Sequence, residues 1–108
     1  MSLSNDKKLT IIYRIEPGCL GPQGSEHIQA FCVFAQKEFD ALNMNYAQWK
    51  IVPRENKALP EVEYQLKGKR MAKDKTERFL QIFDENLSDF EQHMDQTLAQ
   101  LIDDYLGR

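Results

Sequence analysis

The sequence predicts an α+β fold, a two-layer sandwich in which helices cover one face of a small mixed sheet. Three observations lead to this class. Two stretches, 8–16 and 61–69, alternate apolar and polar residues, as half-buried strands do. A helical stripe of apolar residues lies between them, and a second helical pattern continues almost to the end of the chain. The predicted order is strand, helix, strand, strand, helix.

The first strand is expected over 8–16, where β-branched and aromatic residues dominate. Pro17 and Gly18 end it and open a loop. Ser25 is a suitable N-cap for the first helix. The apolar stripe of that helix consists of Ile28, Phe31, Cys32, Ala35, Phe39 and Leu42. Residues 43–45 are expected to end the helix, because asparagine tolerates the left-handed conformation.

The second and third strands are expected over 46–52 and 61–69, joined as an antiparallel hairpin with a long loop. The residues predicted to point inward are Ala47, Trp49, Ile51, Val62, Tyr64 and Leu66. A right-handed crossover makes the first two strands parallel. We place the third strand between them, which gives a three-stranded, ferredoxin-like plan without its last strand and leaves the first strand at an edge.

The stretch 73–106 contains no proline or glycine, and as one helix it would be about 51 Å long at 1.5 Å per residue. A domain of this size has a radius of gyration of only about 13 Å. Ser88 and Glu91 form a capping-box pattern just after Asn86. We therefore predict that the last helix is kinked or split near residues 86–88.

The length of 108 residues fits a single domain, with residues 1–7 as a flexible leader. No apolar run approaches the ~20 residues that span a bilayer, and the polar start lacks the apolar core of a secretory signal. Two cysteines are too few for a disulfide framework. These features predict a cytoplasmic protein with free thiols and no membrane attachment.

Charge is distributed unevenly, although the net charge is only −3. Nine basic and five acidic residues lie between positions 50 and 78, whereas one basic and seven acidic residues follow. The stretch Lys67–Arg70 offers weak contact to phosphates. Trp49 and Tyr64, the aromatic residues that would stack bases, are assigned to the core. A mildly acidic chain of this kind is not expected to be a dedicated nucleic-acid binder.

The loop before the first helix is the most distinctive part of the sequence. Gly18, Gly21 and Gly24 are spaced by three, and Ser25 and His27 follow at the helix N-terminus. Backbone N–H groups and the positive end of a helix can hold a phosphate or a carboxylate there. The loop matches neither the dinucleotide-binding fingerprint nor the P-loop. A tight turn that needs positive φ angles is therefore the competing interpretation.

Cys19 lies in the same loop and is the candidate reactive thiol, because a helix N-terminus and the imidazole of His27 both favour a thiolate. Nothing in the sequence supplies a third, orienting group. Cys32 belongs to the core stripe, and a metal site built from Cys19, His27 and Cys32 would have irregular spacing. The sequence therefore predicts no catalytic set, no metal site and no cofactor, and an enzyme is the least favoured class.

The favoured function is a binding or assembly module that acts as a homodimer, with another protein as an alternative partner. An edge-located first strand would offer unpaired backbone beside Ile11, Ile12 and Tyr13. The last helix carries more apolar residues than a small sheet covers, namely Leu98, Leu101, Ile102 and Tyr105. Folding of that helix over the edge would cover both surfaces within one chain. The other hypotheses are an anionic-ligand site at Gly18–Ser25 and weak nucleic-acid contact through Lys67–Arg70.

Overall fold

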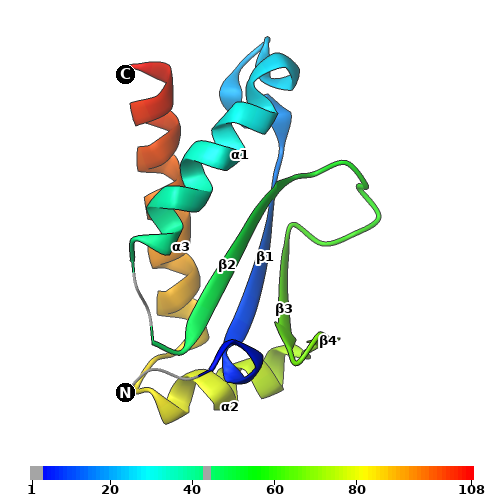
Figure 1. Ribbon diagram of the computed structural model, residues 1–108, viewed down its shortest axis with the longest axis vertical. Helices are drawn as coiled ribbons and strands as arrows, with labels where there is room; N and C mark the ends of the chain where they lie inside the picture. Colours follow the sequence, from blue (N-terminus) through cyan, green and yellow to red (C-terminus); the bar gives the residue numbers. More distant parts are fainter. Residues whose placement is uncertain (1–3, 43–44) are drawn as a thin grey trace.

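The computed structural model describes residues 4–42 and 45–108 (Figure 1). Its strands are β1 (Leu9–Ile15), β2 (Ala47–Pro53), β3 (Val62–Leu66) and the two-residue β4 (Lys69–Arg70). Its helices are α1 (Gly24–Asp40), α2 (Lys73–Ile82) and α3 (Leu87–Leu106), and two 3-10 helices, η1 (Asn5–Lys7) and η2 (Pro17–Leu20), lie before α1. The predicted α+β class is confirmed, and part of the predicted leader forms η1.

The described strands form a mixed sheet in the order β2-β1-β3-β4. β1 pairs in parallel with β2, with Leu9 opposite Ala47. On its other side β1 pairs antiparallel with β3, with Tyr13 opposite Val62. The prediction of three strands with the third between the first two is therefore wrong, as is the hairpin between the second and third strands. The first strand lies inside the sheet and not at its edge.

The segment 54–61 explains this order, because it crosses the carboxyl end of β1 instead of turning back as a hairpin. On one side of β1, the Arg54 N–H donates to the Ile15 carbonyl oxygen at 2.9 Å. On the other side, the Arg14 N–H donates to the Glu61 carbonyl oxygen at 2.7 Å. The chain thus leaves β2 on one side of β1 and enters β3 on the other.

The two faces of the sheet differ in character. α1 and α3 lie beside one another against one face, and α2 crosses below the end of the sheet (Figure 1). The β1 side chains on the helix face are buried, namely Leu9, Ile11, Tyr13 and Ile15. Trp49 and Tyr64 are also buried there, as predicted. The alternate β1 side chains are half-buried and lie on the opposite, open face, where Thr10 and Arg14 are polar and Ile12 is apolar.

Helix α1 begins at Gly24, one residue before the predicted cap. Gln23 is the N-cap residue, and its side chain makes no capping hydrogen bond. The prediction of Ser25 as the N-cap is therefore wrong, since Ser25 lies inside the first turn. The predicted core stripe is confirmed up to Phe39, and Leu42 packs against the core after the helix ends. Positions 43 and 44 of the predicted end signal lie outside the described residues.

The final helical stretch is divided, as predicted. α2 ends at Ile82 and α3 begins at Leu87, and between them Asp84 adopts a left-handed conformation with φ 60°. The side-chain oxygen of Asn86 caps α3 by accepting the Asp89 N–H at 2.8 Å. The expected capping box from Ser88 is wrong, because the helix starts before that residue.

The apolar residues predicted to be surplus on the last helix are used within the chain. Leu98 and Leu101 are buried in the core. The Tyr105 ring packs edge-on against Phe31 with 5.4 Å between the ring centroids, and Ile102 packs against the same core. Since β1 is also internal, the predicted strand edge is closed, and the predicted helix surface is partly used within the chain, with Ile102 and Tyr105 half-buried.

Candidate functional site

Two of the three glycines in the loop meet a constraint, and the two constraints differ. Gly21 has a positive φ of 92°, which fits the tight-turn interpretation. Gly24 lies against backbone, so that a β-carbon there would be 1.7 Å from the Pro17 carbonyl oxygen. A β-carbon on Gly18 would meet nothing within 4 Å, and its φ is not positive. The sequence identified the loop, but only the structure shows which of its glycines are constrained.

Several N–H groups of this loop already have acceptors within it. The Cys19 N–H donates to the Glu16 carbonyl oxygen at 3.0 Å, and the Gly21 N–H donates to the Gly18 carbonyl oxygen at 3.2 Å. The Gly24 N–H donates to the Gly21 carbonyl oxygen at 3.0 Å. The anion site stays a prediction, with fewer available donors than the sequence indicated.

The two polar side chains predicted to assist an anion lie in the first turn of α1, directly after the glycine loop. Ser25 is exposed in the first turn of α1. The His27 ring packs edge-on against the Tyr105 ring of α3, with 6.2 Å between the centroids. The structure therefore uses His27 in the contact between α1 and α3.

The environment of Cys19 opposes formation of a thiolate. Cys19 is exposed at the surface, but neighbouring protein atoms remove part of the water around its thiol. This desolvation and the nearby carboxylates of Glu61 and Glu16 raise the pKa of the thiol. A higher pKa leaves less thiolate at neutral pH, which is the reverse of what the helix N-terminus alone would produce. Cys32 is buried, as the predicted core stripe requires.

We expect the two thiols to react at very different rates with an aromatic disulfide reagent. At about pH 8, Cys19 should react in the native protein, but more slowly than free cysteine, because its thiolate fraction is reduced. Burial raises the pKa of Cys32 to about 11, so this thiol should react only after denaturation. Two fast thiols per native chain would contradict the burial of Cys32. The time course of thiolate release from the reagent, with and without denaturant, measures the reaction rates of both cysteines.

β2 is a seven-residue strand at the edge of the sheet. The Leu9 N–H donates to the Tyr46 carbonyl oxygen, and the Arg54 N–H donates to the Ile15 carbonyl oxygen. In a parallel ladder this pattern directs the backbone of even-numbered β2 residues toward β1. The backbone of the odd-numbered residues therefore points outward.

At the centre of this edge, the side chain of Gln36 from α1 occupies the place of a neighbouring strand. Its Nε2 donates to the Trp49 carbonyl oxygen at 2.9 Å, and its Oε1 accepts the Ile51 N–H at 2.8 Å. One donor and one acceptor of the outward edge are thereby satisfied. Sequence reasoning did not find Gln36, because a glutamine beside a core stripe carries no signal of its partner.

A groove of about 380 Å³ lies between the β2 edge and α1. Two of its lining side chains are exposed apolar residues, Val33 at 61% and Val52 at 36%. Cys32 and Ile51 contribute further apolar surface, and Lys37 is the charged residue among the described residues that line the groove. The groove and the β2 edge together form an apolar surface that the chain itself leaves open.

Two tyrosines fasten α3 to the sheet beside another hollow, of about 450 Å³. The Tyr13 hydroxyl donates to Asp95 at 2.9 Å, and the Tyr64 hydroxyl donates to Glu91 at 2.8 Å. Burial, together with these carboxylate acceptors, raises the pKa of both phenols far above the usual range. Both hydroxyls therefore stay protonated near neutral pH, where they act as fixed donors and not as proton-transfer groups.

Within the described residues, no group of three His, Cys, Asp or Glu side chains is arranged to hold a metal ion. No helix of residues 4–42 and 45–108 is long and apolar enough to cross a membrane. Comparison of the chain with protein-family models, curated proteins and solved structures finds no match. The function is therefore argued from the geometry.

Proposed function

We propose that this protein is an assembly module that forms a homodimer by pairing the β2 edges of two copies. The observation that carries this proposal is the Gln36 amide, which bonds the edge at the positions a neighbouring strand would use. An edge strand of seven residues is long enough to template another strand. The homodimer expected from the sequence is retained, and its interface moves from β1 to β2.

An antiparallel pair centred on Trp49 is the arrangement that best fits the side chains of β2. In this register Lys50 lies opposite Gln48 of the second copy, so that like charges do not face each other. A register centred on Lys50 would instead place two lysines side by side. Pro53, which has no N–H to donate, falls outside the paired segment.

Apolar contact supplies the second contribution. Val33 and Val52 flank the edge and are exposed in one copy. In the register centred on Trp49, residue 52 of one copy lies opposite residue 46 of the other, so the second strand would cover Val52, next to Val33, with its own Tyr46. Burial of this surface favours association at about 25 cal/mol per Å² of apolar area.

Displacement of Gln36 opposes pairing only weakly. Each bond that its amide makes to Trp49 and Ile51 would be replaced by a backbone bond from the second strand, so the number of bonds to the edge does not fall. The Gln36 amide also donates to the Asp40 carboxylate at 2.9 Å, a contact that it can keep.

Sedimentation equilibrium at micromolar to submillimolar concentration tests the proposal. We expect the wild type to sediment as a dimer of twice 12.6 kDa. The dissociation constant of the dimer should be at least about tenfold higher in Val33→Asp. Leu59→Asp is the matched control, since Leu59 is 39% exposed in the segment 54–61, which leads from β2 across the end of β1, and its change should leave dimerisation intact. Gln36→Ala should tighten the dimer, because it removes the competing amide. A single 12.6 kDa species throughout the range would rule the homodimer out.

A further inference from the structure

A second candidate binding surface lies on the open face of the sheet, away from the β2–α1 groove. A hollow of about 550 Å³ opens there between β2, β1 and the β3–β4 turn. Its polar lining consists of Asp6, Thr10, Gln48, Lys50, Gln65 and Lys67. The hollow therefore combines two lysines with hydroxyl and amide side chains and one carboxylate, that of Asp6.

The hollow continues into a run of basic residues. Lys67 and Gly68 form the two-residue turn, with φ angles of 55° and 77°. From the turn onward, six exposed cations lie within twelve residues of the sequence, namely Lys67, Lys69, Arg70, Lys73, Lys75 and Arg78. Among the described residues, Arg70 is the cation of this set that has an ion-pair partner: its guanidinium lies 3.6 Å from the Glu63 carboxylate. The other five are available to an external anion.

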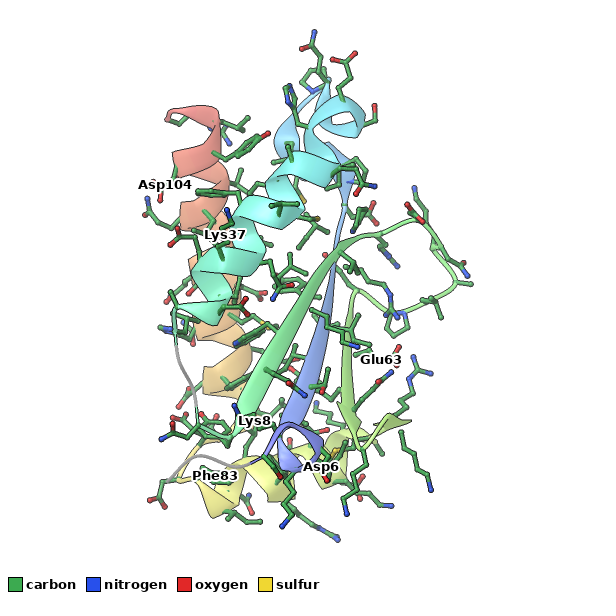
Figure 2. All side chains as sticks on the ribbon, viewed as in Figure 1. Asp6, Lys8, Lys37, Glu63, Phe83 and Asp104 are labelled. Atoms are coloured by element: carbon green, nitrogen blue, oxygen red, sulfur yellow. The ribbon has the colours of Figure 1, made fainter. Side chains whose placement is uncertain are left out.

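The sheet separates this surface from the carboxylates of α3. Of the seven carboxylates that follow α2, five belong to α3, which packs on the helix face, and the other two, Asp84 and Glu85, lie between α2 and α3. In Figure 2, Asp104 lies on α3 at the left of the view, whereas Asp6, which lines the hollow, lies near the lower end of β1. The net charge of −3 therefore does not describe the field at the open face.

We propose that the open face, from Lys50 to the Lys67–Arg70 turn, binds single-stranded nucleic acid without sequence preference. The lysines would contact phosphates, and Thr10 and Gln65 would contact ribose hydroxyls. The Gln65 amide nitrogen already donates to Glu63 at 2.6 Å, which leaves its amide oxygen as an acceptor. A ribose hydroxyl can donate to this oxygen, whereas the carboxylates of an acidic protein segment cannot. Because Trp49 and Tyr64 are buried on the helix face, base stacking is absent and the affinity is weak and electrostatic.

Fluorescence anisotropy with a labelled oligouridylate about 12 nucleotides long tests this proposal. With about three phosphates neutralised, the logarithm of the affinity should fall against the logarithm of salt concentration with a slope near −2. The double variant Lys67→Glu/Lys69→Glu should bind at least about tenfold more weakly and with a shallower slope. Both residues are exposed, so the variant should keep its native circular dichroism and melting temperature.

Lys57→Glu/Arg108→Glu is the control with the same change in net charge, since both residues are exposed and lie away from the turn. It should bind like the wild type. Equal weakening in the two double variants would show an effect of total charge and overturn the proposal. Competition by polyglutamate of equal charge as strong as that by RNA would assign the surface to an acidic protein partner and overturn it as well. Neither variant alters the β2 edge, so the dimer and this surface fail or succeed separately.

Discussion

Replacing Gly24 by alanine is expected to destabilise the fold by about 3 kcal/mol or more. A β-carbon at this position would lie 1.7 Å from the Pro17 carbonyl oxygen and 2.6 Å from its carbonyl carbon. Both atoms belong to the backbone of η2, which therefore cannot move aside as a flexible side chain can. The start of α1 would have to separate from η2, and the loop between them would lose its packing.

Chemical denaturation of Gly24→Ala and Gly18→Ala measures this effect. Gly18 is the matched control, because it lies in the same loop, has no positive φ and would meet nothing within 4 Å. Its replacement should change the free energy of unfolding by no more than about 0.5 kcal/mol. Equal stability of the two variants would mean that η2 and α1 do not approach as described.

Trp49→Ala should cost about 3–5 kcal/mol, because this indole occupies the centre of the core. The Trp49 ring is stacked on Phe90 with 5.6 Å between the centroids and an interplanar angle of 2°, and it contacts Phe39 at 4.8 Å. Removal of the ring leaves a cavity between the sheet, α1 and α3. All three elements lose contact at once, so the loss should appear in the global unfolding transition.

The variant Trp49→Phe separates the contribution of ring packing to stability from that of the indole N–H group. Among the described residues the buried Nε1 of Trp49 has no hydrogen-bond partner, so phenylalanine loses some volume but also removes an unsatisfied donor. We expect a cost below about 1.5 kcal/mol, measured by urea denaturation beside Trp49→Ala. A loss as large as that of the alanine variant would indicate a partner for Nε1.

The sequence alone determined the features that depend on local periodicity and on individual backbone preferences. Alternation identified the strands around Ile11 and Tyr64, and the stripe from Ile28 to Phe39 identified α1 and the face it buries. The division of the last helix was also predictable, because a straight helix of that length does not fit a domain whose radius of gyration is 14.2 Å. The cap was placed two residues late, because Ser88 and Asn86 are both suitable cap residues.

Only the tertiary structure decided which strands are neighbours. Alternation shows which side chains face the core, but it is the same for a central strand and an edge strand, so the sequence did not exclude an edge position for β1. The path of residues 54–61 across the end of β1 fixes the order, through backbone bonds between Arg54 and Ile15 and between Arg14 and Glu61. The same holds for the candidate sites. Gln36 meets Trp49, and Lys50 shares a hollow with Lys67, because the fold brings together residues that are far apart in the chain.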